Sequence, residues 1–184
     1  MTLLPGYSWF ENALSDLGSW YRTDLGELQV VSAVFFNGGL IVTGLFLLYY
    51  SQYFIRSLKD LPTKVAMIAF ACTCVFLVGV GIFSEDFRLQ HFIAALSYFL
   101  TIPIALGLVG LVWLRHKEIR WFAVVSLILA FISYIAIFQS WASIAFRELG
   151  EALIAIGWLW TVDFMHYTGR LTSIVKPVDT MDQV

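Results

Sequence analysis

Five long apolar runs constrain this chain more than any other feature of its sequence. Each run is about as long as the 20 or so apolar residues that a helix needs to cross a bilayer, and the first four contain no Asp, Glu, Lys or Arg. The runs span residues 28–50, 65–83, 91–114, 122–142 and 149–167. Because the connections are short, consecutive helices should run antiparallel. The sequence therefore predicts an all-α, polytopic transmembrane helical bundle with five membrane spans.

The composition supports this class and excludes others. Hydrophobic residues make up 60% of the chain and charged residues 13%, whereas soluble domains have about 45–50% and about 25%. A net charge of −2 offers no basic surface for nucleic acid. The two cysteines, Cys72 and Cys74, lie inside an apolar run, which favours packing over a disulfide framework.

The positions of the three histidines argue against a metal or haem centre. His91 begins the third run, whereas His116 and His166 lie beyond or near the far ends of the third and fifth runs. Since the third and fifth helices should begin on the same side of the membrane, most of the bilayer separates His91 from the other two. We therefore expect no metal site and no cofactor.

The distribution of Lys and Arg predicts the orientation, because cytoplasmic loops carry an excess of both. One side of the predicted bundle carries Arg56, Lys59, Lys64, Arg115, Lys117, Arg120, Arg170 and Lys176. The other side carries only Arg22, Arg88 and Arg147. We expect a multi-pass protein of the cell membrane with its N-terminus outside and its C-terminus in the cytoplasm. Residues 1–27 should form an outer helix and loop, residues 28–168 the bundle, and residues 169–184 a cytoplasmic tail.

The segment SWFENALSDLG, residues 8–18, predicts a short amphipathic helix on the outer face. Ser8 and Glu11 have the spacing of a capping box, and Gly18 follows as a helix stop. The apolar face comprises Phe10, Ala13, Leu14 and Leu17, and the polar face includes Asn12, Ser15 and Asp16. Two poses are open: the polar face is solvated, or it folds over the bundle and lines an outer polar site.

Further polar residues gather at the predicted outer ends of the spans. They are Glu85, Asp86, Arg88, His91, Arg147 and Glu151. Glu85 and Asp86 suit the first turn of a helix capped by Ser84, and Arg147 can pair with Glu151 four residues along. His91 and Glu151 should share a depth, so we expect His91 to contact Glu151 or the loop acids. Either a structural ion-pair network or a ligand site explains this cluster.

Three stretches together resemble a prokaryotic integral-membrane family, the domain of unknown function 998, related to the Frag/DRAM/Sfk group. They are PGYSWFENALSDLG (residues 5–18), GIFSEDFRLQHFIAALSYF (residues 81–99) and RELGEALIAIGWLW (residues 147–160). The resemblance implies a six-helix template, no established activity, and functional polar residues at Asn12, Ser15, Asp16, His91 and Glu151. It also implies a membrane helix before the first motif. We expect that this chain lacks that helix, begins after it, or borrows one from a partner.

Several functions fit these observations. The leading hypothesis is a protein of unassigned activity, an accessory or structural subunit of a membrane complex with an outer-face polar pocket. Its partners would be membrane lipids and other membrane subunits or further copies of itself. The alternative is an intramembrane lipid-acting hydrolase in which His91 is the general base beside a carboxylic acid. A small transporter ranks third, since five spans without a repeat offer little for alternating access. The lack of a nucleophile motif favours a non-catalytic protein.

Overall fold

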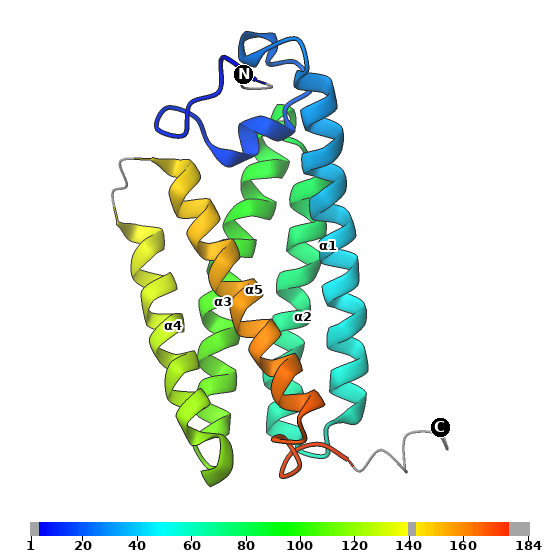
Figure 1. Cartoon of the computed structure of the whole chain (residues 1–184), viewed down its shortest axis with the longest axis vertical. Coiled ribbons are helices and arrows are strands. Elements are labelled where there is room, and N and C mark those ends of the chain that lie inside the picture. Colours follow the sequence, from blue (N-terminus) through cyan, green and yellow to red (C-terminus); the bar gives the residue numbers. More distant parts are fainter. Residues whose placement is uncertain (1–3, 140–142, 177–184) are drawn as a thin grey trace.

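The computed structural model describes residues 4–139 and 143–176. In these ranges five long helices form a bundle (Figure 1). They are α1 (Gln29–Ser57), α2 (Leu61–Ile82), α3 (Arg88–Trp113), α4 (Arg120–Phe138) and α5 (Ile144–Tyr167). Short 3-10 helices lie between them: η1 (Leu14–Gly18), η2 (Thr23–Leu25), η3 (Glu85–Phe87) and η4 (Lys117–Ile119). No strand occurs in the described ranges, and the predicted all-α fold is confirmed.

Four of these helices, α1 to α4, are long and apolar enough to cross a membrane. The fifth, α5, has 24 residues and runs between the same two ends of the bundle (Figure 1). It differs in carrying Arg147, Glu148 and Glu151 near its start and Asp163 near its end. The chain is therefore a membrane-type helical protein, and a crossing by α5 stays a prediction.

The first two helices extend beyond the apolar runs that predict them. α1 continues from residue 50 to Ser57, and α2 begins at Leu61. The start of α2 is fixed locally, because the Asp60 carboxylate accepts the Thr63 N–H at 2.9 Å and caps the helix. Pro62 is tolerated there, since the first turn needs no backbone N–H. Hydropathy therefore locates the apolar part of each helix but not its ends.

Large side chains fill one half of the bundle, the half in which α1, α3 and α5 end and α2 and α4 begin. Phe54, Met67, Trp113, Phe122 and Trp158 are all at most 2% exposed. A buried indole N–H needs an acceptor. That of Trp113 donates to Thr63 Oγ1 at 3.2 Å, and that of Trp158 donates to Ser126 Oγ at 2.8 Å. Each tryptophan thereby ties two helices together inside the apolar core.

Two glycines bring α1 and α2 into backbone contact. A Cβ atom on Gly44 would lie 3.1 Å from the Cys74 carbonyl oxygen, and one on Gly81 would lie 2.8 Å from the Asn37 carbonyl oxygen. Larger residues would therefore push the helices apart. Small residues at helix interfaces are typical of bundles in membranes, where close backbone approach drives association.

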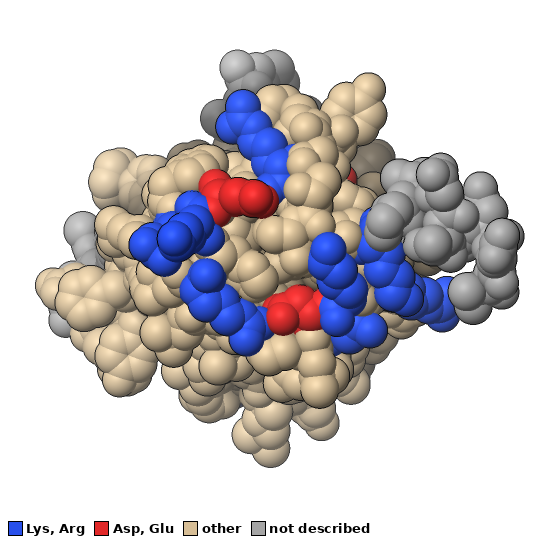
Figure 2. Space-filling view, turned by 90° about the horizontal axis from the view of Figure 1, so that it is seen from below, with Lys and Arg blue, Asp and Glu red and all other residues tan. Residues whose placement is uncertain are grey.

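The end of the bundle that holds the α1–α2 and α3–α4 connections is here called the basic end. Figure 2 shows blue Lys and Arg side chains spread across it, with few acids between them. The C-terminal segment, residues 168–176, folds against this end. Leu58 and Val175 form an antiparallel bridge, and the Lys176 N–H donates to the Ser57 carbonyl at 2.8 Å. The predicted tail is thus packed up to residue 176, and residues 177–184 lie outside the described ranges.

Candidate functional site at the N-terminal cap

Residues 4–28, here called the N-terminal cap, fold over the opposite end of the bundle (Figure 1). Polar side chains of α1 hold it there. Gln29 Nε2 donates to the carbonyls of Asp16 and Ser19 at 3.0 and 2.8 Å, and Asn37 Nδ2 donates to that of Gly18 at 2.8 Å. A Cβ atom on Gly18 would lie 2.5 Å from Asn37 Oδ1. This contact requires glycine and seats η1 directly on α1.

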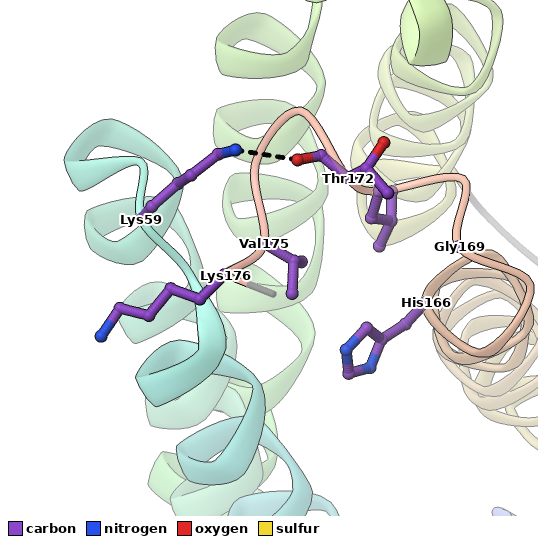
Figure 3. Close-up of a pocket in the computed structure, with 7 residues that line it drawn as sticks. Lys59, His166, Gly169, Thr172, Val175 and Lys176 are labelled. Atoms are coloured by element: carbon purple, nitrogen blue, oxygen red, sulfur yellow. Dashed lines mark hydrogen bonds between the residues drawn. The ribbon is translucent and has the colours of Figure 1, made fainter. Parts of the chain in front are cut away.

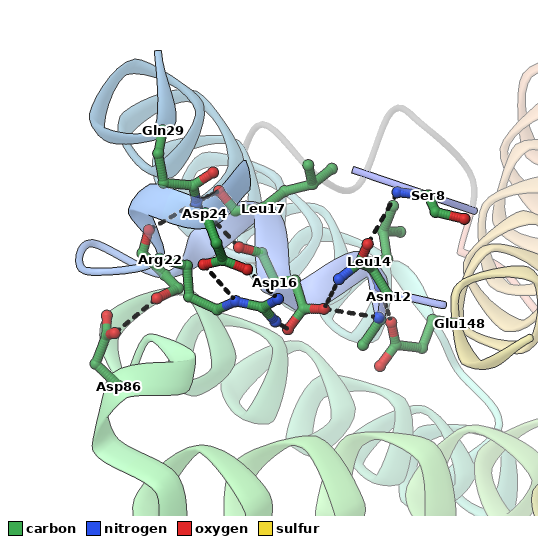
Figure 4. A network of polar contacts seen from close by, with 12 residues as sticks. Ser8, Asn12, Leu14, Asp16, Leu17, Arg22, Asp24, Gln29, Asp86 and Glu148 are labelled. Carbon is green, nitrogen blue, oxygen red and sulfur yellow. Dashed lines mark hydrogen bonds and ion pairs between the residues drawn. The ribbon is translucent and has the colours of Figure 1, made fainter. Parts of the chain in front are cut away.

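A carboxylate, Asp16, organises the inside of the cap (Figure 4). Its Oδ2 accepts Asn12 Nδ2 and the Ala13 N–H, both at 3.0 Å, and its Oδ1 pairs with Arg22 at 2.8 Å. Burial alone would raise the pKa of Asp16, but Glu85, Asn12, Arg22 and the Ala13 N–H together lower it. Asp16 is 4% exposed and Asn12 is 9% exposed. The polar side of this segment therefore faces inward, as in the second predicted pose.

Two more acids reach the cap from other helices. Glu148 on α5 accepts the Leu14 N–H at 2.7 Å, and Asp86 in η3 accepts Ser19 Oγ at 2.7 Å and the Trp20 N–H at 2.8 Å. Glu148 and Asp16 also act on a buried phenol: burial first, and then these two charges, raise the pKa of Tyr7 to about 12. Backbone N–H groups of the cap thus depend on carboxylates far away in the sequence.

The cap covers a polar pocket at the N-terminal ends of α3 and α5, with a volume of about 460 Å³. Its polar wall consists of Ser15, Glu85, Arg88, His91, Arg147 and Glu148. Its apolar wall consists of Phe92, Ala95, Leu96 and Phe99. A smaller hollow of about 90 Å³ shares Ser15, His91 and Glu148 and extends toward Leu40 and Leu77. The space therefore passes from a charged rim to an apolar interior.

The acids and the arginines around this pocket differ in whether they have partners. Glu85 lies beside Asp16, and Glu148 is engaged by the cap backbone. In contrast, neither Arg88 nor Arg147 forms an ion pair with a carboxylate in the described part of the chain. The Arg147 guanidinium lies over the Phe99 ring, 6.0 Å from its centre. Two guanidinium groups thus border the pocket with donors to spare.

His91 is oriented by a backbone contact. Its Nδ1 lies 2.7 Å from the Phe83 carbonyl oxygen, which can only accept, so Nδ1 carries the hydrogen. The neutral ring then has its lone pair on Nε2, the tautomer that a general base requires. His91 shares the pocket with Glu85 and Glu148.

Glu151 does not join this pocket. It lines a separate groove between α4 and α5. Of the two alternatives expected for His91, proximity to Glu151 is therefore wrong, whereas the loop acid Glu85 does line the same pocket as His91. The expected ion pair between Arg147 and Glu151 is also not formed among the described residues. Positions 148 and 151 are three residues apart, about 60° around the helix. That rotation points Glu148 to the cap and Glu151 to α4.

The predicted helix over residues 8–18 is also wrong in detail. Only Leu14–Gly18 is helical, as a 3-10 turn. The Ser8 N–H donates to Asn12 Oδ1 at 2.9 Å, so the expected capping box between Ser8 and Glu11 does not form. Side chains of Asn and Asp compete with helical hydrogen bonds in this way. Ser84 likewise makes no cap; its hydroxyl donates to Asp86 at 2.9 Å.

A second pocket of about 290 Å³ lies at the basic end (Figure 3). Lys59, His166 and Lys176 line it, and Lys59 Nζ donates to the Thr172 carbonyl at 2.9 Å. This contact belongs to the packing of the C-terminal segment. Across the described residues, no three His, Cys, Asp or Glu side chains are grouped as a metal site would need.

A family profile described as "Protein of unknown function (DUF998)" matches residues 1–164, which include the cap, the pocket and nearly all of α5. The chain belongs to the DUF998 family. No curated protein and no solved structure matches it. Membership in DUF998 confirms the resemblance drawn from the three sequence stretches, and it attaches no activity to the fold.

Within this DUF998 protein, residues that the sequence did not single out complete the cap. Glu148 is the clearest omission, because it lies between Arg147 and Glu151, which the sequence did single out. Arg22, Gln29 and Asn37 also hold the cap. Asn37 lies inside an apolar run, and a lone amide at membrane depth is the signal that could have revealed it.

Proposed function

We propose that this DUF998 protein is a non-catalytic membrane protein whose polar pocket binds the anionic headgroup of an amphiphile. One observation carries the proposal: Arg88 and Arg147 border the pocket without a carboxylate partner in the described ranges. Guanidinium groups bind phosphate and carboxylate through paired N–H donors. The apolar wall, which includes Phe92, Leu96 and Phe99, suits the chain of such a ligand.

An accessory role in a membrane complex is part of the same proposal. The cap presents exposed aromatic side chains to its surroundings, with Phe10 69% and Tyr21 81% exposed. Exposed aromatic groups are enriched where proteins meet partners. The cap can thus contact a neighbouring subunit while its inner side covers the pocket.

Retention of phosphatidylglycerol by the purified protein, measured by native mass spectrometry, tests the binding proposal. Arg88→Gln should retain about tenfold less of this lipid, because one charge-assisted contact is lost. Arg56→Gln is the matched control, since Arg56 is an exposed arginine at the basic end. Equal retention by Arg88→Gln and Arg56→Gln would contradict the proposal.

A lipid-acting hydrolase is the second candidate, because the His91 ring has the hydrogen on Nδ1. In that case the wild-type protein should turn over lipid in a vesicle assay, and His91→Gln should abolish that turnover. If the wild-type protein releases no fatty acid or headgroup from mixed lipid vesicles, the non-catalytic proposal stands over this one.

A further inference from the structure

A groove of about 280 Å³ lies between α4 and α5, and of its lining residues only Arg147 is shared with the polar pocket. Phe131, Ile132, Ile135 and Ile154 make its wall apolar. Glu151 also lines it. Because Arg147 borders both spaces, the two sites are tested separately through residues that only one of them has, Arg88 for the polar pocket and Gly150 for this α4–α5 groove.

A buried acid of this groove and a hydroxyl group beside it lack hydrogen-bond partners among the described residues. Glu151 is 1% exposed, yet neither of its carboxyl oxygens has a hydrogen-bond partner among the described residues. Ser133 on α4 is 0% exposed, and its hydroxyl lies beside Glu151 without the geometry of a hydrogen bond. Burial of an ionised acid inside a membrane protein costs free energy unless the acid is paired. Such an arrangement indicates that something else supplies the donors.

We propose that the α4–α5 groove binds one lipid whose headgroup carries a primary ammonium. The ammonium lies at Glu151 and Ser133, the phosphate lies at Arg147, and an acyl chain follows the apolar wall. A primary ammonium has three N–H donors and no acceptor. The site offers three acceptor oxygens without partners, two from Glu151 and one from Ser133. The number and polarity of the groups therefore match.

The depth of the acid favours a lipid over a second membrane helix. A helix presents a broad surface, whereas Glu151 lines the groove and is only 1% exposed. An ammonium on a flexible headgroup is small enough to reach it. Gly150 also leaves room beside the acid, since no atom lies within 4 Å of where its Cβ would be.

The test measures lipid retention by the full-length protein with native mass spectrometry, in nanodiscs of phosphatidylethanolamine, phosphatidylcholine and phosphatidylglycerol in equal parts. The wild type should retain one phosphatidylethanolamine and about tenfold less phosphatidylcholine, whose quaternary ammonium has no N–H. Glu151→Gln should lower phosphatidylethanolamine retention about tenfold, because it removes the charge. Glu118→Gln, at an exposed acid of the basic end, should have no effect.

A second pair of variants tests the groove by shape. Gly150→Leu should fill it and displace the lipid, whereas Gly157→Leu changes an exposed glycine outside the groove that also has no neighbour within 4 Å. This pair decides the matter if Glu151→Gln does not fold. Phosphatidylglycerol retention should stay unchanged in Gly150→Leu, which separates this site from the polar pocket.

Three results would overturn the proposal. The first is equal retention of phosphatidylethanolamine by the wild type and by Gly150→Leu. The second is retention of phosphatidylcholine by the wild type to the same extent as phosphatidylethanolamine. The third is that Gly150→Leu abolishes a stable oligomer and leaves lipid retention unchanged, which would show that a protein fills the groove.

Discussion

The two ends of this bundle are both closed by a segment outside the long helices, but by different means. At the cap end, the buried Asp16 and the partly buried Glu148 and Asp86 accept hydrogen bonds from the backbone of the N-terminal cap. At the basic end, the C-terminal segment is attached mainly by backbone contacts, such as that between Lys176 and Ser57. Asp60 is an acid of the basic end; it caps α2 and pairs with the half-exposed Arg115.

This difference indicates where the stability of the fold depends on single side chains. Removal of a buried acid leaves its donors without partners, and the desolvation cost of those donors remains. Removal of a partly exposed acid lets water replace it, so an exposed ion pair contributes little. The cap should therefore be sensitive to single substitutions, and the basic end should tolerate them.

The largest expected effect is that of Asp16→Ala. It removes the acceptor for Asn12, the Ala13 N–H and Arg22, so the free energy of unfolding should fall by about 3 kcal/mol. Chemical denaturation in detergent, with Glu118→Ala as an exposed control, measures this. A loss no greater than that of the control would show that the cap is not anchored through Asp16.

A pair of glycine substitutions gives the next contrast. Gly18→Ala should cost about 2 kcal/mol, because its Cβ would meet Asn37 and Phe36 within 3 Å. Gly169→Ala at the basic end should cost only about 1 kcal/mol. Gly169 has open space around it, and its cost comes from the backbone φ of +70° that ends α5. A reversed order in thermal denaturation would contradict the importance of close packing at the cap.

Asp60→Ala should have a smaller effect than Asp16→Ala. The loss of the cap on α2 should lower the free energy of unfolding by about 1 kcal/mol. Arg115→Ala should add little, since its ion pair is partly exposed. If Asp60→Ala were as damaging as Asp16→Ala under the same denaturant, the contrast between the two ends would be lost.

The smallest expected effect is a loss of stability at low pH. The pKa of Asp16 and that of Asp60 are both lowered in the folded protein, so each carboxylate stabilises the fold above its unfolded pKa of about 3.9. That stability is lost as the pH falls through the lowered folded values. The unfolding free energy should therefore decline below about pH 4. Asp16→Asn should show a shallower decline; an unchanged profile would exclude Asp16 as a contributor.

The parts that the sequence predicts are those governed by local composition. Apolar runs predict the helices because burial in lipid depends on the residues of the run itself. The C-terminal end of α1 is missed because the helix continues beyond its apolar run. The conformation of residues 8–13 is missed because Asn12 and Asp16 redirect backbone hydrogen bonds. Glu148 is missed for another reason: its contact with Leu14 joins residues 134 positions apart.

The candidate site is predicted less completely than the fold. The polar residues of the cap and of α3 are identified by type, but the sequence cannot tell which way α5 is rotated. That rotation separates Glu148 from Glu151 and places them in two different hollows. Neighbouring polar residues on a helix that contacts several others are thus poor guides to a shared function.

The uneven filling of the bundle has a consequence for its motions. Large aromatic and aliphatic side chains, among them Trp113 and Trp158, pack the half toward the basic end, whereas the other half encloses the hollows beside the cap. Regions with fewer buried apolar contacts open locally at lower free energy. Amide hydrogens should accordingly exchange fastest in the cap and the adjacent turns of α3 and α5, and slowest around the two tryptophans. The tightly packed half should then stay closed while the cap end opens locally.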